Sequence, residues 1–126
     1  MRNIRILMVR LGIDNNDQES KRLYKELENV GFDILYTGLH QTAEMILDVT
    51  LSFNADVVLF DLAPNANTKE IEHFEKIIKY NDLYEPLIVV RSGKTVEEPY
   101  INFNKNENIT NIAERIKKHV HVMKIV

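Results

Sequence analysis

The polar side chains that could do chemistry in this sequence follow short apolar runs. Asp14, Asp17 and Glu19 make an acidic segment after the first run, and Asp61 directly follows the third. Carboxylates placed there could hold a divalent cation or accept a phosphoryl group, although they also commonly cap helices or begin turns. None of the four histidines is spaced to form a nucleophile and base pair. We therefore expect a binding site rather than a catalytic or metal site.

Composition excludes several classes of function. Without cysteine, the chain cannot form disulfides, iron–sulfur clusters or cysteine zinc sites. A net charge of -3, spread over both halves, gives no basic surface for nucleic acid or an anionic membrane. No apolar stretch is long enough to span a bilayer, and the start does not resemble a secretory signal. We expect one cytoplasmic domain over residues 1–126, with neither nucleic acid nor membrane as a partner.

Three short runs rich in branched apolar residues predict buried strands. They cover Ile4–Val9, Val57–Phe60 and Leu87–Val90, and Asp33–Tyr36 predicts another strand after the first. Strands buried on both faces are typical of parallel sheets, in which helical crossovers join successive strands.

Segments with apolar residues at helical spacing lie between these runs. Gly31 ends the first segment, and Thr42 is a good N-cap for the second. Asn67 or Thr68 would cap the third, and the last segment begins near Ile109. This alternation predicts a flavodoxin-like, Rossmann-like doubly wound α/β domain with a five-stranded parallel sheet.

One crossover is missing near the end of the chain. The segment between Val90 and Ile101 is too short for a helix between parallel strands, and it contains Pro99. Tyr100–Phe103 is therefore a fifth parallel strand reached by a bare loop, which we favour, or a strand turned back through residues 92–94.

Without that helix, apolar side chains of the last two strands would be left uncovered. Leu87, Val89, Ile101 and Phe103 lie in these strands. An uncovered apolar patch favours association, so we expect a homodimer, with the apolar tail Val120–Val126 as the alternative cover.

The segment from Gly31 to Asp61 carries the most specific pattern. It contains Gly-Phe-Asp-Ile-Leu-Tyr-Thr-Gly-Leu-His-Gln-Thr and then Ala-Asp-Val-Val, while Leu-Gly-Ile-Asp precedes it in the same register. This pattern resembles the cobalamin-binding domain of methylmalonyl-CoA mutase. The resemblance implies a cofactor site in the loops at the carboxyl ends of the strands, including Gly38, Leu39, Gln41 and Thr42.

The first cofactor motif of that family is Asp-x-His-x-x-Gly. Its imidazole is the lower ligand of cobalt, and its aspartate holds the far ring nitrogen. The matching positions here are Asp14, Asn16 and Glu19. A carboxamide at Asn16 cannot replace the imidazole, and Glu19 stands where glycine admits the nucleotide tail of the cofactor.

The other two motifs are also altered. The family has Ser-x-Leu after the third strand, lining the pocket for the displaced benzimidazole, and this chain has Asp61-Leu-Ala63. A glycine pair follows the fourth strand in the family, whereas Ser92 and Gly93 stand here after Arg91. The resemblance thus implies a non-catalytic module in which cobalamin binding is weak or lost.

The family also suggests a protein partner. Its radical chemistry belongs to the cofactor and to a separate barrel domain, which this chain lacks. The chain could therefore be a free-standing partner of a mutase large subunit.

An alternative is a receiver-like signalling domain. The stretch Ala55–Pro64 also resembles the third strand of response-regulator receivers, in which an aspartate at the position of Asp61 accepts a phosphoryl group. Ser92 and Lys105 could supply the hydroxyl and the lysine of that family. The first strand, however, ends in arginine and leucine rather than in the acidic pair that holds Mg²⁺.

Overall fold

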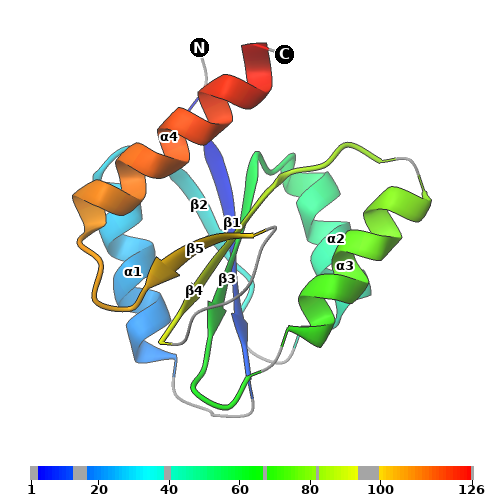
Figure 1. Ribbon diagram of the computed structural model, residues 1–126, viewed down its shortest axis with the longest axis horizontal. Coiled ribbons are helices and arrows are strands. Elements are labelled where there is room, and N and C mark those ends of the chain that lie inside the picture. Colours follow the sequence, from blue (N-terminus) through cyan, green and yellow to red (C-terminus); the bar gives the residue numbers. More distant parts are fainter. Residues whose placement is uncertain are drawn as a thin grey trace.

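A computed structural model describes residues 3–12, 17–38, 41–66, 68–81, 83–93 and 100–125, with side chains as far as His121. Within these residues, strands and helices alternate until the last crossover (Figure 1). The elements are β1 (Arg5–Leu11), α1 (Gln18–Asn29), β2 (Asp33–Tyr36), α2 (Ala43–Phe53), β3 (Val57–Leu62), α3 (Lys69–Tyr80), β4 (Leu87–Ser92), β5 (Ile101–Asn104) and α4 (Ile109–Ile125).

The strands form one parallel sheet in the order β2-β1-β3-β4-β5. This is the flavodoxin-like order, so the predicted fold is confirmed. The order reverses between β1 and β3, and the chain leaves these two neighbouring strands toward opposite faces of the sheet. Doubly wound sheets bind their ligands at such a reversal, beyond the carboxyl ends of the strands.

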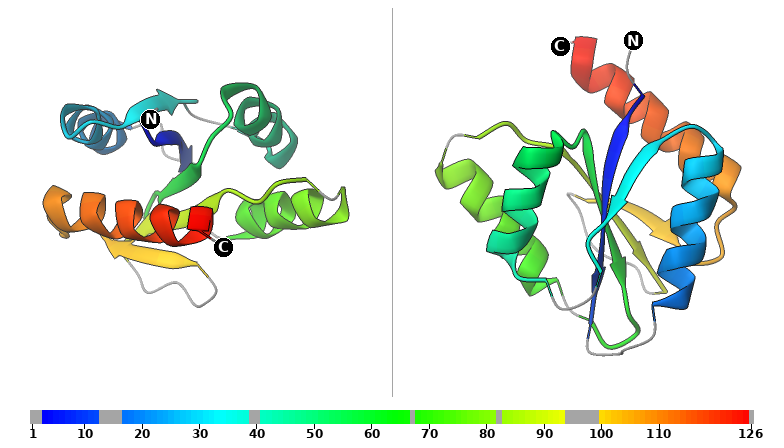
Figure 2. Two further views of the ribbon diagram at one scale, coloured as in Figure 1. Left: turned by 90° about the horizontal axis from the view of Figure 1, so that it is seen from above. Right: turned by 180° about the vertical axis from the view of Figure 1, so that it is seen from behind.

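Helices cover both faces of the sheet (Figure 2). α1 and α4 lie on one face, and α2 and α3 lie on the other. Side chains alternate along each strand, so Met8 and Leu59 pack under α1 and α4 while Val9 and Phe60 pack under α2 and α3. Because each face is covered, the strands read as continuous apolar runs in the sequence.

The predicted helix signals are largely confirmed. The Thr42 hydroxyl accepts a hydrogen bond from the Met45 N–H at 3.2 Å and caps α2. Thr68 occupies the N-cap position of α3 without a side-chain cap, and Asn67 lies outside the described residues. Gly31 follows α1 with a φ of 105°, a backbone angle that favours glycine.

β5 runs parallel to β4, with Ile101 opposite Val89. This confirms the bare-loop interpretation, since the described residues between β4 and β5 include no helix. Residues 94–99 lie outside the described residues.

The expected uncovered patch is not built from the residues we predicted. Val89 and Phe103 are buried, and Leu87 and Ile101 pack against the same cluster under α1 and α4. The pleat of β4 and β5 turns all four toward the covered face, so the prediction that some of them face the open side is wrong. The alternate residues Ile88 and Asn102 point to the opposite face, where Ile88 packs against the cluster under α2 and α3.

The C-terminal segment continues α4 instead of folding back over the sheet. Val120 is buried in the cluster under α1 and α4, and the helix extends to Ile125. Its last turns project beyond the start of β1 (Figure 1). In the described part of the chain, no helix combines the length and the apolar character needed to cross a membrane.

Candidate functional site

Asp61 is the centre of a buried charged cluster at the carboxyl edge of the sheet. Arg10 on β1 and Arg91 on β4 stand directly opposite Asp61 on β3 in the strand register. All three side chains therefore leave the sheet on the face covered by α1 and α4. The Arg91 Nη1 lies 2.9 Å from the Asp61 Oδ1, and the Arg10 Nη1 lies 3.3 Å from the Oδ2.

Two further side chains complete this cluster. The Ser20 hydroxyl of α1 donates a hydrogen bond to the Asp61 Oδ2 at 2.5 Å. The Lys105 Nζ, from the turn after β5, lies 3.9 Å from the Asp61 Oδ1 and 3.4 Å from the Glu19 Oε2. We call Asp61 and these four partners, Arg10, Arg91, Ser20 and Lys105, the Asp61 cluster. The cluster connects β1, β3, β4, α1 and the turn between β5 and α4.

The cluster is almost closed to solvent. The Asp61 side chain is 0% exposed and that of Arg10 is 3% exposed, whereas Glu19 is 59% exposed. Charges removed from water are tolerated only when they are paired and hydrogen-bonded. The contacts of Asp61 therefore fix its carboxylate in place.

A second polar contact joins the end of β2 to the start of α1. The Tyr36 hydroxyl at the end of β2 donates to the Asp17 Oδ2 at 2.7 Å, and Lys21 lies 3.6 Å from the same carboxylate. The Tyr36 hydrogen bond lowers the pKa of Asp17, while burial and the Asp17 carboxylate raise the pKa of Tyr36. Asp17 thus occupies the N-cap position of α1, but its side chain binds Tyr36 and Lys21 instead of capping the helix.

A pocket of about 350 Å³ lies between α1, the end of β4 and the start of α4. Its lining includes the apolar residues Leu23 and Ile112, but most of the lining is charged. The charged lining residues are Glu19, Arg22, Glu26, Arg91, Lys105 and Glu107. We call this space the α1–α4 pocket.

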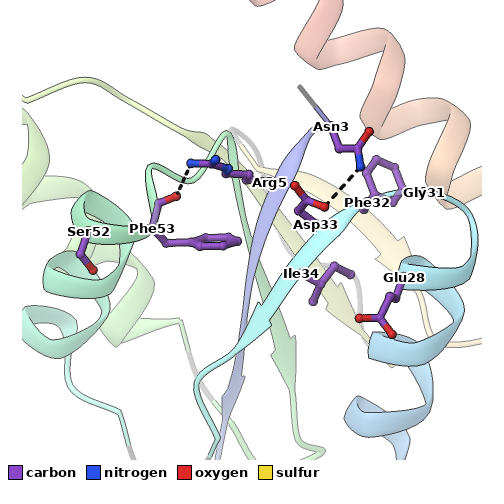
Figure 3. A pocket seen from close by; sticks show the side chains of 9 residues that line it. All are labelled: Asn3, Arg5, Glu28, Gly31, Phe32, Asp33, Ile34, Ser52 and Phe53. Atoms are coloured by element: carbon purple, nitrogen blue, oxygen red, sulfur yellow. Dashed lines mark hydrogen bonds between the residues drawn. The ribbon is translucent and has the colours of Figure 1, made fainter. Parts of the chain in front are cut away.

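A larger hollow of about 570 Å³ lies at the opposite, amino-terminal edge of the sheet (Figure 3). Its polar groups are engaged within the protein, because the Arg5 Nη1 donates to the Phe53 carbonyl and the Asn3 amide donates to Asp33. Since ligands of this fold bind at the carboxyl edge, the Asp61 cluster and the α1–α4 pocket are the better candidate site.

The predicted site residues divide into three groups. Asp61, Glu19, Ala63 and Ser92 lie at the carboxyl edge, where the motifs placed them, and Gly93 follows there in open space. Ala63 is in close contact with Gly12, because a Cβ built on Gly12 would lie 2.4 Å from the Ala63 Cβ.

The second group lies in the loop after β2 and supports local structure. The Gln41 side-chain amide donates to the Thr37 carbonyl at 3.3 Å, and Thr42 caps α2. Gly38 has a φ of 87°, which favours glycine. The third group, Asp14, Asn16 and Leu39, lies outside the described residues.

The sequence-based prediction missed Arg10, Ser20 and Tyr36. A charged residue within an otherwise apolar strand is a usable signal, because Arg10 interrupts the run Met-Val-Arg-Leu just as Asp61 interrupts Leu-Phe-Asp-Leu. Among the described residues, no group of three or more His, Asp or Glu side chains is arranged to hold a metal ion.

Comparison with known proteins identifies the family. The chain is 30% identical over 97 residues to the small subunit of 2-hydroxyisobutanoyl-CoA mutase from Aquincola tertiaricarbonis. The matched region covers 75% of this chain and 69% of the relative. The chain belongs to the family of cobalamin-binding domains found in mutase small subunits. The resemblance drawn from the Gly31–Asp61 segment is thereby confirmed. No family model matches the chain.

Solved structures support the same fold. The methanol:cobalamin methyltransferase complex of Methanosarcina barkeri gives a TM-score of 0.74 at 9% identity, covering 93% of this chain and 46% of that chain. A cobalamin-binding protein of Desulfitobacterium hafniense gives 0.60 at 13% identity, with 97% and 58% covered. The pseudo-receiver domain of CikA gives 0.64 at 12% identity, with 92% and 95% covered. This chain thus spans less than two thirds of the two cobalamin proteins, and at these identities the likeness concerns the fold alone.

Proposed function

We propose that this chain is a non-catalytic member of the cobalamin-domain family that does not bind cobalamin tightly with its base displaced. The observation that carries the proposal is the Asp61 cluster. The family motif places a small hydroxyl at this position, lining the pocket for the displaced base. Here the position holds a buried carboxylate engaged by Arg10, Arg91 and Ser20.

The α1–α4 pocket supports the same proposal. A flat aromatic base is best held by apolar walls, whereas this pocket is lined by Arg22, Arg91, Lys105 and three carboxylates. Placing the base there would remove water from these charged groups without providing partners for them. The cost opposes binding of the nucleotide tail.

Glu19 adds an electrostatic obstacle. Glu19 lines the α1–α4 pocket, and its carboxylate lies 3.4 Å from the Lys105 Nζ. The family has glycine at this position, and the phosphate of the tail would meet a negative charge here. Together with Asn16, which has no imidazole to offer cobalt, Glu19 makes base-displaced binding unfavourable.

We further propose that the chain acts as a small protein partner of a mutase-type large subunit. The relative in Aquincola tertiaricarbonis is itself the small subunit of a mutase. In this family the radical chemistry belongs to the cofactor and to a separate barrel domain, so a role in catalysis would require such a partner. Co-purification of the tagged chain with a co-expressed large subunit is the expected result, and separate elution of the two would contradict the partnership.

Spectral titration with hydroxocobalamin and adenosylcobalamin tests the loss of binding. We expect no displaced-base spectrum at micromolar protein, and a clear shift with sub-micromolar affinity would overturn the proposal. The double variant Asn16→His with Glu19→Gly serves as the gain-of-binding control. If it binds no better than the wild type, the obstacle lies in the Asp61 cluster rather than in the first loop.

The receiver alternative has one supporting observation, the approach of Lys105 to within 3.9 Å of Asp61. A phosphoacceptor, however, needs an accessible carboxylate oxygen, and the Asp61 side chain is buried with both oxygens engaged. We expect no labile adduct by intact mass spectrometry after treatment with acetyl phosphate and Mg²⁺. A metal-dependent adduct that Asp61→Asn abolishes would reverse the order of the two functions.

A further inference from the structure

The missing crossover leaves a hollow beside α3. In a doubly wound sheet a helix normally packs over each pair of successive parallel strands. The described residues between β4 and β5 include no helix, and α4 packs on the other face, so α3 is the last helix described on its face (Figure 2). A hollow of about 460 Å³ lies between α3 and α4 at the amino ends of β4 and β5. We call it the α3–β5 pocket.

Most of the lining of the α3–β5 pocket is apolar. Tyr100 contributes an aromatic ring, and burial followed by the nearby Glu75 carboxylate raises the pKa of its hydroxyl, so the ring stays neutral. An apolar hollow in contact with water is best filled by an apolar or aromatic group. The apolar and aromatic lining residues are Ile78, Pro86, Leu87, Ile88, Tyr100 and Ile101, and the polar ones are Glu75, Lys79, Glu85 and His119.

An exposed aromatic ring stands next to this pocket. Tyr80 ends α3 and directly follows Lys79, which lines the pocket. The Tyr80 side chain is 90% exposed, whereas Met45, the next most exposed large apolar side chain among the described residues, is 45% exposed. Tyrosines carry much of the binding energy at protein interfaces, because the ring buries a large apolar area while the hydroxyl can still form a hydrogen bond.

We propose that a second copy of this chain docks here about a two-fold axis, with each Tyr80 in the α3–β5 pocket of the other copy. A two-fold interface pairs one surface with itself, so a ring and a hollow that lie side by side meet twice. The charges also fit. Lys76 is exposed on α3 one turn before Tyr80, and Glu75 and Glu85 line the pocket that this turn would approach. Opposite charges across an interface favour association and fix its register.

This inference goes beyond the proposed function and does not involve cobalamin. It also differs from the uncovered strand patch expected from the sequence, because the four side chains of that patch pack under α1 and α4. The interface instead uses the end of α3 and the hollow beside it.

Sedimentation velocity of the full chain, from micromolar to hundreds of micromolar, tests the proposal and should show a monomer–dimer equilibrium. Tyr80→Ala removes both rings from the dimer and should raise its dissociation constant at least about thirtyfold. Met45→Ala is the matched control, because it truncates an exposed apolar side chain of α2 outside the pocket, and it should leave the dissociation constant unchanged.

Two variants change the pocket rather than the ring. Ile88→Glu introduces a charge into the apolar lining and should prevent association, with circular dichroism to check the fold. Glu85→Lys reverses a charge at an exposed lining residue, so it should fold normally and weaken the dimer.

Mixing the variants tests whether the insertion is mutual. Tyr80→Ala keeps the pocket and Ile88→Glu keeps the ring, so a dimer of either variant with itself has no inserted ring. A mixed dimer has one, because Tyr80 of the Ile88→Glu copy can enter the pocket of the Tyr80→Ala copy. The mixture should therefore associate more tightly than either variant alone.

Three results would overturn the proposal. One is a wild type that stays monomeric over the whole concentration range. Another is a Tyr80→Ala variant that associates as tightly as Met45→Ala. The third is a mixture of folded Tyr80→Ala and Ile88→Glu that associates no better than its components, since the ring and the pocket would then not meet.

Discussion

Replacing Asp61 by asparagine removes the negative charge around which Arg10, Arg91 and Lys105 gather, with little change of shape. Arg91 and Lys105 are partly exposed and can recover some hydration, but the Arg10 side chain is only 3% exposed and cannot. Breaking a buried ion pair in this way costs about 3 to 5 kcal/mol. Because two of the three cations can rehydrate, we expect a loss near the lower limit, about 3 kcal/mol.

Urea denaturation followed by circular dichroism measures this loss as a difference in the free energy of unfolding. Asp48→Asn is the matched control, because Asp48 is exposed on α2 and its replacement should change stability by less than about 0.5 kcal/mol. Adding Arg10→Met to Asp61→Asn also removes the buried positive charge of Arg10, so the double variant should regain part of the loss. If Asp61→Asn unfolds within about 0.5 kcal/mol of the wild type, the buried cluster does not exist as described.

Three further predictions concern other contacts. Tyr36→Phe removes the hydrogen bond to Asp17 and should cost about 1 kcal/mol at neutral pH, as measured in urea. Since the pKa of Asp17 is lowered by folding, this contribution is present above the pKa of the unfolded carboxyl and lost in acid, so the two proteins should converge in stability at low pH. Gly12→Ala should destabilise the fold by about 2 kcal/mol or more in the same assay, because Gly12 has a φ of 129° and the new Cβ would clash with Ala63. Light scattering at tens of micromolar should report a dimer that Ile88→Glu weakens, whereas a monomeric wild type would remove the homodimer prediction.

Most of the fold could be predicted from the sequence, because each element carries its own local signal. The run Val57–Phe60 and the cap at Thr42 are both defined by neighbours in the chain, and both are confirmed. The orientation of β5 was open from the sequence alone, since the choice depended on whether the chain could cross back without a helix. The sequence could not predict toward which face of the sheet four side chains point, those of Leu87, Val89, Ile101 and Phe103. The face depends on the pleat of two strands whose register is a tertiary property.

The candidate site was predicted only in part, because three of the strands are longer than the sequence predicted. The apolar runs predicted strands ending at Val9, Phe60 and Val90, yet each strand continues for two more residues. The extra residues are polar or charged at Arg10, Asp61 and Arg91, which would normally argue against a buried strand.

These residues remain in the sheet because they neutralise one another across it. Arg10 and Arg91 are separated from Asp61 by 51 and 30 positions in the chain, but the parallel register places them side by side. From the sequence alone, Asp61 could therefore be interpreted as a cap, a phosphoacceptor or a degenerate cofactor residue, since each interpretation considered it with its sequence neighbours. Its partners in space change the chemistry, because a carboxylate held by two arginines is unavailable as a nucleophile and occupies the place of a pocket wall. The same extension of the strands places Arg91 in the lining of the α1–α4 pocket.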